Sequence, residues 1–232
     1  MRDCEGASYK LVTTMRRKLM KVRAAALALG TIALLGGVCL AGKQFVMPEA
    51  HAAKSYPAHD EHPTEAVAVG LDPYDSPNKL EIFTVNYPQN GLLPIFVVVT
   101  NDGDQPVSLA NMNAQLETGD RTKISPSTQE DVYRRLSRPS TSGKASPLPW
   151  PTKVKGAVSQ KTKDEIERAQ FAAKAVEPHS TQSGFMFFDV SDIAAPLAGA
   201  HFYLTGVNDA KGNELMYFEI SLDKYLNSSG SR

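Results

Sequence analysis

The chain has 232 residues, 42% of them hydrophobic, and its only cysteines are Cys4 and Cys39. This length suits one domain plus a targeting segment, and the cysteine positions exclude a disulfide or thiol nucleophile beyond residue 39. The formal charge of zero conceals a segregation, because residues 1–52 hold eight Lys/Arg and three Asp/Glu while residues 53–232 carry a net charge of −5.

The N-terminal region has the order of an export signal. Five basic residues between positions 16 and 23 precede an uncharged run, residues 24–42, which Lys43 ends. This is the layout of a signal peptide, and the 19-residue run also approaches the roughly 20 residues that span a bilayer as a helix. Ala50-His51-Ala52 offers the favoured cleavage site, which predicts a mature chain that begins near Ala53, and Cys39-Leu40-Ala41 offers a closer but poorer one. We therefore predict that residues 1–52 are a cleaved signal or a retained anchor, and that the rest lies in the periplasm or cell envelope.

Residues 53–64 are predicted to form a flexible spacer, since they contain proline and histidine and show no strand or helix pattern. Within them, His59 and His62 flank two acidic residues and offer imidazole ligands for zinc or copper. Metal binding requires a held backbone, so a solvated polar segment is the favoured interpretation. His59 and His62 remain the candidate metal ligands.

Residues 65–226 are predicted to form the folded domain, and residues 227–232 a polar tail. The strongest signal is LLPIFVVVT, residues 92–100, which a polar turn and a return segment, residues 106–109, follow. This pattern predicts the buried strand of a β hairpin. Further strands are expected over residues 65–71, 79–87, 113–117, 183–190, 200–207 and 214–222. In the last of these, alternation places Met216, Phe218, Ile220 and Leu222 on one face.

Residues 121–177 interrupt the strand pattern and are predicted to be a helical insertion. Capping boxes that begin at Ser127 and Thr162 predict helices over residues 128–136 and 163–176. Their apolar faces are thin, which places both helices on the strands and not in the core. Residues 137–160, between them, contain four prolines and no acidic residue, so we expect this segment to be mobile.

The insertion has a net charge of +6, against −11 for the rest of the exported chain. Such a basic segment is predicted either to lie on the acidic part of its own domain or to bind an anionic protein or envelope surface. Nucleic acid is disfavoured by the compartment and by the scarcity of aromatic residues among the basic ones. The candidate partner-binding residues are Lys144, Lys153, Lys155, Lys161 and Lys163.

Two segments carry a resemblance to a known family. VVVTNDGDQPVSL, residues 97–109, and EPHSTQSGFMFFDVSD, residues 177–192, resemble the telokin-like immunoglobulin domains of exported bacterial proteins. The predicted strands number about seven, the count of an immunoglobulin-like antiparallel sandwich, and the resemblance implies the same mainly β fold. The predicted fold therefore has an N-terminal apolar export helix followed by such a sandwich, and its helical insertion departs from the compact form of that family. These are fold motifs without active-site content.

Catalytic motifs are absent from the sequence. It contains no G-x-S-x-G, H-E-x-x-H or phosphate-loop pattern, and His179 and His201 are better explained as turn or edge residues. We therefore predict a non-catalytic extracytoplasmic interaction or accessory module without a cofactor. The alternative is a periplasmic metal- or ligand-handling protein that uses the His-containing spacer.

Overall fold

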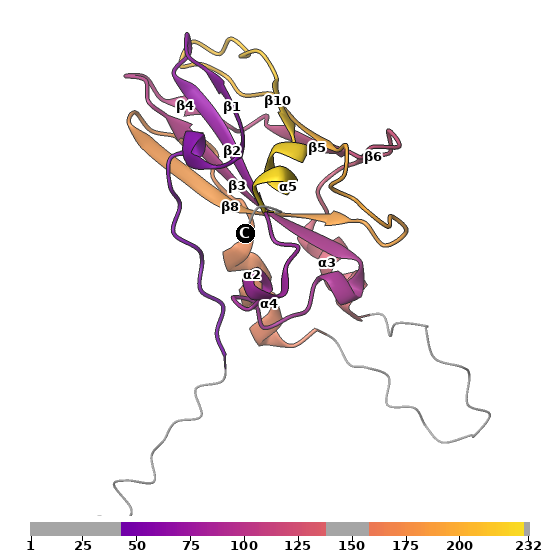
Figure 1. Cartoon of the computed structure of the whole chain (residues 1–232). Helices are drawn as coiled ribbons and strands as arrows, with labels where there is room; N and C mark the ends of the chain where they lie inside the picture. The colour runs from indigo at the N-terminus through magenta and orange to yellow at the C-terminus, as the bar shows by residue number, and fades with distance from the viewer. Residues whose placement is uncertain (1–42, 138–157, 230–232) are drawn as a thin grey trace, which may run out of the picture. The chain divides into compact units, whose positions relative to one another are not determined.

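The computed structural model describes residues 43–137 and 158–229, which form a mainly β unit with two four-stranded sheets (Figure 1). In the first sheet the order is β1 (Ala58–His62), β2 (Val67–Pro73), β3 (Leu92–Asn101) and β8 (Ser180–Asp189). In the second it is β10 (Phe218–Ser221), β9 (His201–Thr205), β5 (Asn113–Glu117) and β6 (Lys123–Ile124). Neighbouring strands pair antiparallel throughout both sheets. The predicted mainly β, antiparallel architecture is confirmed.

Strand β3 is the central element, as the sequence predicts. All ten of its residues are buried, and it pairs with β2 along one edge and β8 along the other. Both of its faces are covered, which explains the uninterrupted apolar run. The predicted hairpin is wrong, because both edges of β3 are taken. The return segment forms β4 (Val107–Ser108), which pairs with β7 (Ala175–Val176), and Asn101 directs this departure by donating from Nδ2 to the Val176 carbonyl at 3.1 Å.

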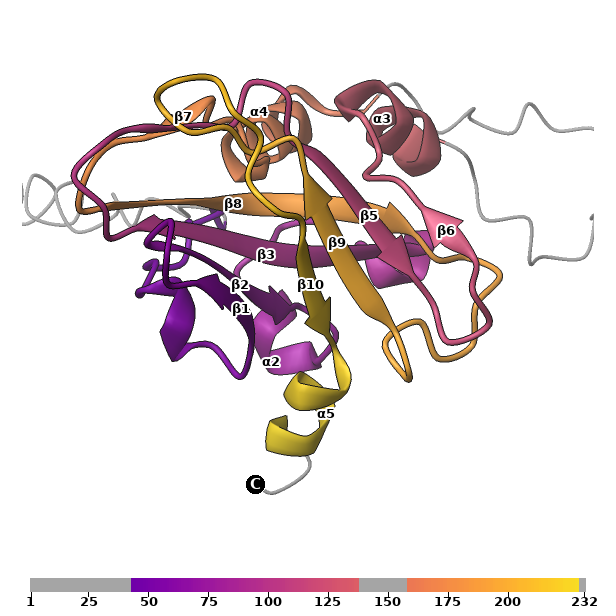
Figure 2. The same cartoon turned by 90° about the horizontal axis from the view of Figure 1, so that it is seen from above.

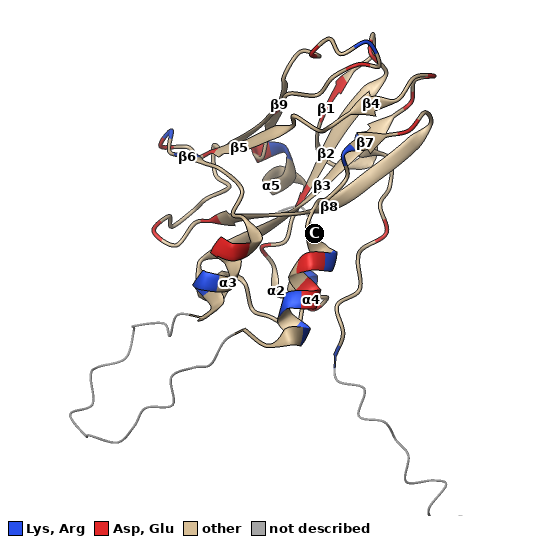
Figure 3. Ribbon diagram, turned by 180° about the vertical axis from the view of Figure 1, so that it is seen from behind, with Lys and Arg blue, Asp and Glu red and all other residues tan. Residues whose placement is uncertain are grey.

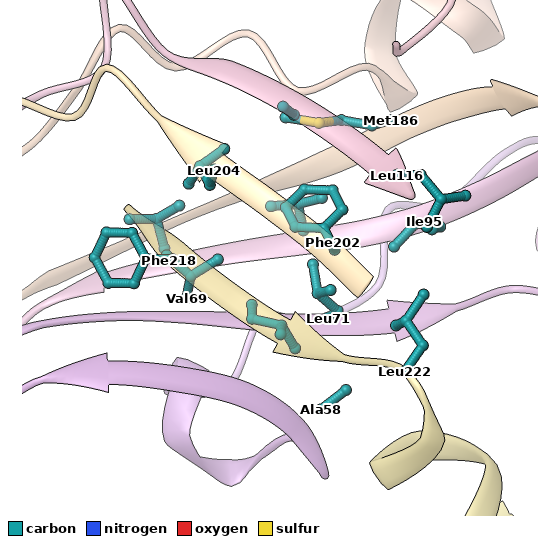
Figure 4. Close-up of a cluster of buried hydrophobic side chains, with 14 of the residues drawn as sticks. Ala58, Val69, Leu71, Ile95, Leu116, Met186, Phe202, Leu204, Phe218 and Leu222 are labelled. Atoms are coloured by element: carbon teal, nitrogen blue, oxygen red, sulfur yellow. The ribbon is translucent and has the colours of Figure 1, made fainter. Parts of the chain in front are cut away.

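The two sheets pack face to face around a hydrophobic cluster that we call the inter-sheet core (Figure 4). Figure 2 shows β9 and β10 crossing over β3. Alternate residues of each strand point inward, so aliphatic and phenylalanine side chains fill the space between the sheets. The labelled members in Figure 4 are Ala58, Val69, Leu71, Ile95, Leu116, Met186, Phe202, Leu204, Phe218 and Leu222.

The opposite face of the first sheet is covered by helices and irregular segments, which enclose the helix-side core. The covering elements are η1 (Ala53–Ser55), α2 (Pro77–Leu80), η2 (Pro88–Asn90), α3 (Gln129–Ser137) and α4 (Gln160–Ala169). Val132 of α3 and Ile166 of α4 are fully buried there. The helices lie on the sheet as predicted, but they also build a second core.

The predicted strand over residues 79–87 is wrong. Pro77 opens the short helix α2, where its fixed φ suits the first helical turn. The Thr84 amide then donates to the Glu165 carboxylate at 2.8 Å and not to a strand, and Pro88 starts η2. Phe83 and Tyr87 turn into the helix-side core instead, with ring centroids 5.0 Å apart.

Helix α3 is confirmed. Helix α4 begins three residues before the predicted start and ends at Ala169, well before the predicted end at residue 176. Ser159, and not Thr162, is its N-cap, since the Ser159 hydroxyl accepts from the Thr162 amide at 3.2 Å. The helix ends at Ala169 because the chain then joins β8, with the Phe171 amide donating to the Phe185 carbonyl at 2.9 Å. This approach needs Gly184, where a Cβ would lie 2.4 Å from the Phe171 Cα.

Both ends of the described unit are more ordered than predicted. The predicted spacer is wrong, because residues 58–62 form β1 and the compact unit begins at Lys43. Phe45 is buried and stacks on Phe83 with centroids 5.4 Å apart. At the other end, α5 (Asp223–Ser229) buries Tyr225 and includes residues 227–229, so the described part of the predicted polar tail is helical. The Tyr225 hydroxyl donates to Asp75 at 2.6 Å, which fixes this helix to the first sheet's end.

Strand β10 begins at Phe218, later than predicted. Met216 is 72% exposed, so it does not share the buried face of Phe218 and Ile220 as predicted. The reason is local, since the Leu215 amide donates to the Val207 carbonyl and the Gly206 amide to the Glu214 carboxylate.

The predicted export run, residues 24–42, and the greater part of the predicted mobile segment lie outside the described residues. Within the described ranges, no helix has the length and hydropathy needed to cross a membrane.

Candidate interaction surfaces

The predicted metal ligands, His59 and His62, both lie on β1 but on opposite faces, since they are three residues apart on a strand. The His59 Nδ1 lies 2.6 Å from the Tyr56 carbonyl oxygen. The His62 ring stacks on Phe218 with centroids 4.0 Å apart. Across the described part of the chain, no three His, Cys, Asp or Glu side chains are grouped so as to hold a metal ion.

The residues around these histidines instead close the seam between the two sheets. Asp60 accepts a hydrogen bond from the Glu219 amide of β10 at 3.0 Å, and its Oδ2 lies 3.8 Å from the His62 Nε2. The edges of β1 and β10 are therefore joined through a side chain and a ring stack. This is a packing role that the sequence pattern did not indicate.

The predicted partner-binding lysines divide into two groups. Lys144, Lys153 and Lys155 lie outside the described residues, whereas Lys161 and Lys163 lie in the first turn of α4. The structure therefore brings together two of the five.

Their surroundings form what we call the insertion base, which consists of the last turn of α3, the first turn of α4 and Lys43. The Lys161 ammonium donates to the Lys43 carbonyl, and the Lys163 Nζ lies 5.7 Å from the centre of the Tyr133 ring on α3. Figure 3 shows α3 and α4 at the same end of the unit, with charges of both signs. The start of α4 thus lies beside α3 and beside Lys43, the residue that ends the apolar N-terminal run.

The arginines at this end are already matched by carboxylates. Arg134 donates to Asp131, and Arg135 donates to Asp189 and to the Ser191 hydroxyl. Hydrogen bonds from Thr128 hold the pKa of Asp131 below its ordinary value. Burial alone would raise the pKa of Asp189, but the hydrogen bonds from Arg135 and Ser191 outweigh it and lower that pKa. Among the described residues, Lys161 and Lys163 make no ion pair with a carboxylate, so their charges remain available.

A buried carboxylate lies behind the insertion base. Glu165 of α4 is 1% exposed and accepts hydrogen bonds from the Thr84 amide, the Thr84 hydroxyl and the Tyr87 hydroxyl, the last at 3.0 Å. Burial and the neighbouring Glu165 carboxylate raise the pKa of Tyr87, so its hydroxyl stays a donor. The network is satisfied and anchors α4 to the segment before η2. From the sequence, Glu165 was predicted only to be the last residue of the capping box that begins at Thr162; the structure shows that it is the buried acceptor of this network.

The outer face of the second sheet carries a second cluster, which we call the tyrosine face. Strand register aligns Glu219 with Tyr203, and Tyr203 with Gln115, across three strands. The next row aligns His201 with Glu117. The cluster consists of Gln115, Glu117, His201, Tyr203, Tyr217 and Glu219.

Glu219 is the central acceptor of the tyrosine face. The Tyr203 hydroxyl donates to its Oε1 at 3.0 Å, and the His201 Nδ1 lies 3.1 Å from the same oxygen. Partial burial and this hydrogen bond raise the pKa of Tyr203. The Tyr203 and Tyr217 rings lie 6.3 Å apart. His179, in contrast, lies beside Asp104 at 3.0 Å on the first sheet's side, so the two histidines weighed for catalysis do not converge.

No protein-family model, curated protein or solved structure matches this chain. The assignment of function therefore depends on sequence pattern and geometry alone.

Proposed function

We propose that this protein is a non-catalytic extracytoplasmic interaction or accessory module with an immunoglobulin-like sandwich fold. Its binding surface is the insertion base together with the basic segment that leaves from it. The partner is an anionic protein or envelope surface. The proposal is supported by the order of the N-terminal region, by the resemblance of residues 97–109 and 177–192, and by the two packed antiparallel sheets.

One contact carries the proposal. The hydrogen bond from Lys161 to the Lys43 carbonyl joins the base of the insertion to the residue that ends the apolar run. In an anchored chain, Lys43 is the first residue after the apolar run, and lysines at this end of the unit would be juxtamembrane residues attracted to anionic headgroups. In a released chain, the same end presents the lysines to a soluble anionic partner.

The packing of residues 43–52 also bears on processing. Cleavage after Ala52 would remove Phe45, which fills a place in the helix-side core against Phe83 and Phe185. We therefore place any cleavage before Lys43, at the Cys39-Leu40-Ala41 site, with the retained anchor as the alternative. Mass spectrometry of the N-terminal peptide from fractionated cells distinguishes these, and a mature terminus at Ala53 would contradict the assignment.

The alternative function, metal handling, would need His59 and His62 to converge on one ion. Strand β1 holds them on opposite faces, and His62 is stacked on Phe218. The geometry thus favours binding through the lysines.

The test compares two sets of five lysine-to-glutamine changes in the full-length protein. The first set removes Lys144, Lys153, Lys155, Lys161 and Lys163. The matched control set removes Lys54, Lys123, Lys174, Lys211 and Lys224. Binding to envelope extract, and to vesicles that contain anionic phospholipid, should fall with the first set and persist with the second. Binding should also weaken between about 50 and 500 mM salt, since exposed charges are screened over roughly 10 Å at 0.1 M. Equal retention by both sets would refute this surface.

A further inference from the structure

We propose that the tyrosine face is a second docking surface, and that it binds a basic, arginine-containing segment of a partner protein. The second sheet and the helices cover opposite faces of the first sheet, so this surface is separate from the insertion base. The inference therefore goes beyond the function proposed above, and either surface can fail its test while the other stands.

An exposed aromatic ring lies at this face. Tyr217 is 51% exposed and is one of the three large hydrophobic side chains most exposed to solvent in the described part of the chain. Its ring lies next to that of Tyr203. Tyrosine is enriched at protein interfaces, where rigid rings give contact area at small entropic cost.

The polar groups of the face match a guanidinium. Two hydrogen bonds hold Glu219 in place. Its carboxylate accepts a hydrogen bond from the Tyr203 hydroxyl, and its backbone amide donates a hydrogen bond to the Asp60 carboxylate. Its second carboxylate oxygen, Oε2, receives no hydrogen bond from a described residue. A guanidinium can lie flat on the Tyr203 or Tyr217 ring and donate to that oxygen at the same time, which an ammonium does less well.

The negative charge of the described unit favours a positively charged partner. The described residues contain thirteen Lys/Arg and 23 Asp/Glu, a net charge of −10, and the face itself carries Glu117 and Glu219. Among the described residues, Lys123 lies 3.7 Å from Glu117 of this face; the lysine side chain is exposed and the glutamate is partly buried, and a competing arginine can displace this lysine. An acidic partner would meet like charge here, and so would the same face of a second copy.

The experiment measures binding of a fluorescein-labelled peptide of four Arg-Gly-Ser repeats to the full-length protein by anisotropy at about 50 mM salt. Peptides with lysine or glutamine in place of arginine provide the comparison. Glu219→Gln should weaken arginine-peptide binding about tenfold and Tyr217→Ala about fivefold, since each removes a charge-assisted hydrogen bond or a stacking ring. Glu130→Gln, an equal charge change on an exposed residue of α3, should alter it less than about twofold.

Three results would overturn the proposal. Equal losses for Glu219→Gln and Glu130→Gln would show attraction by net charge alone. Lysine-peptide binding as tight as arginine-peptide binding would remove the arginine assignment. Sedimentation of the protein as a dimer that Tyr217→Ala dissociates would identify a second copy as the occupant. Circular dichroism of each variant confirms that the exposed substitutions leave the fold intact.

Discussion

Both faces of the first sheet are covered by other parts of the described chain, but in different ways. On one face, four regular strands supply alternating aliphatic and phenylalanine side chains to the inter-sheet core. On the other, short helices and irregular segments supply the helix-side core, where Phe185 contacts the rings of Phe45, Tyr74, Phe83 and Phe96. Only the second face includes a buried carboxylate, Glu165, among the described residues.

This difference shows what each layer requires. The inter-sheet core is stabilised by nonpolar burial, which tolerates substitution as long as volume and pattern are kept. The helix-side core also depends on hydrogen bonds and ring geometry, because segments without a regular ladder must satisfy their backbone amides individually, as Thr84 does with Glu165. We therefore expect nonpolar truncation to affect both faces alike, and deletion of the Glu165 hydrogen bonds to affect the helix side.

The largest effects should come from Phe218→Ala in the inter-sheet core and Phe187→Ala in the helix-side core. Both side chains are completely buried, so each change should lower the free energy of unfolding by about 3–5 kcal/mol. Urea titration followed by far-UV circular dichroism measures this. The spectrum should be β-rich and should not change with a chelator. A loss below about 1 kcal/mol at either site would mean that this face is not packed as described.

Tyr87→Phe tests whether hydrogen bonds, and not only nonpolar burial, stabilise the helix-side core. It removes one hydroxyl that donates to the buried Glu165 carboxylate while keeping the ring, so we expect a loss of about 2 kcal/mol. Tyr217→Phe, on an exposed ring, serves as the control and should be close to neutral. Equal stabilities of the two variants would show that the Glu165 network does not hold the helix layer.

The same contrast explains how much of the fold the sequence predicted. Strands whose residues alternate or are uniformly apolar were predicted correctly, including β3, β5, β8 and β9. Residues 79–87 have the composition of a strand but are held by Pro77, Pro88 and a distant carboxylate, which no local pattern shows. The hairpin after β3 failed because turn residues show that a chain turns and not which strand it then joins.

The candidate sites were predicted less well than the strands. Charge counting located the lysines of the insertion, and Lys161 and Lys163 lie at its base. The contact between Lys161 and Lys43 joins residues 118 positions apart and depends on the fold. The tyrosine face escaped notice, because alternation over residues 214–222 placed Tyr217 and Glu219 outward but could not show that Tyr203 and His201 lie beside them. The segment that holds His59 and His62 was predicted to be a spacer because it becomes a strand only by pairing with β2.

A smaller effect is expected at the start of α4. Ser159→Ala removes the side chain that accepts from the Thr162 amide and should cost about 1 kcal/mol. Thr162→Ala removes the residue that the sequence pattern favoured as the cap and should cost only a few tenths of a kcal/mol, since serine remains the acceptor. The two urea midpoints, measured side by side, compare the caps. A larger loss for Thr162→Ala would reverse the observed assignment.

The smallest effect concerns the ion pair that fixes α3 to the end of β8. Burial tends to raise the pKa of Asp189, but hydrogen bonds from Arg135 and Ser191 outweigh this effect and lower the pKa in the folded protein. The ionised carboxylate therefore stabilises the fold at any pH above its unfolded-state pKa of about 3.9. This stabilisation is lost as the pH falls through the lower pKa of the folded state. The Asp189 side chain is 46% exposed, and solvent screening therefore limits the contribution to less than about 1 kcal/mol.

Asp189→Asn should lower the urea midpoint slightly at pH 7 and become indistinguishable from the parent protein well below pH 4, where the parent carboxylate is itself protonated. Asp192→Asn, on an exposed neighbour, should change neither midpoint. A difference between Asp189→Asn and the parent that persists at low pH would mean that the residue acts through packing and not through its charge.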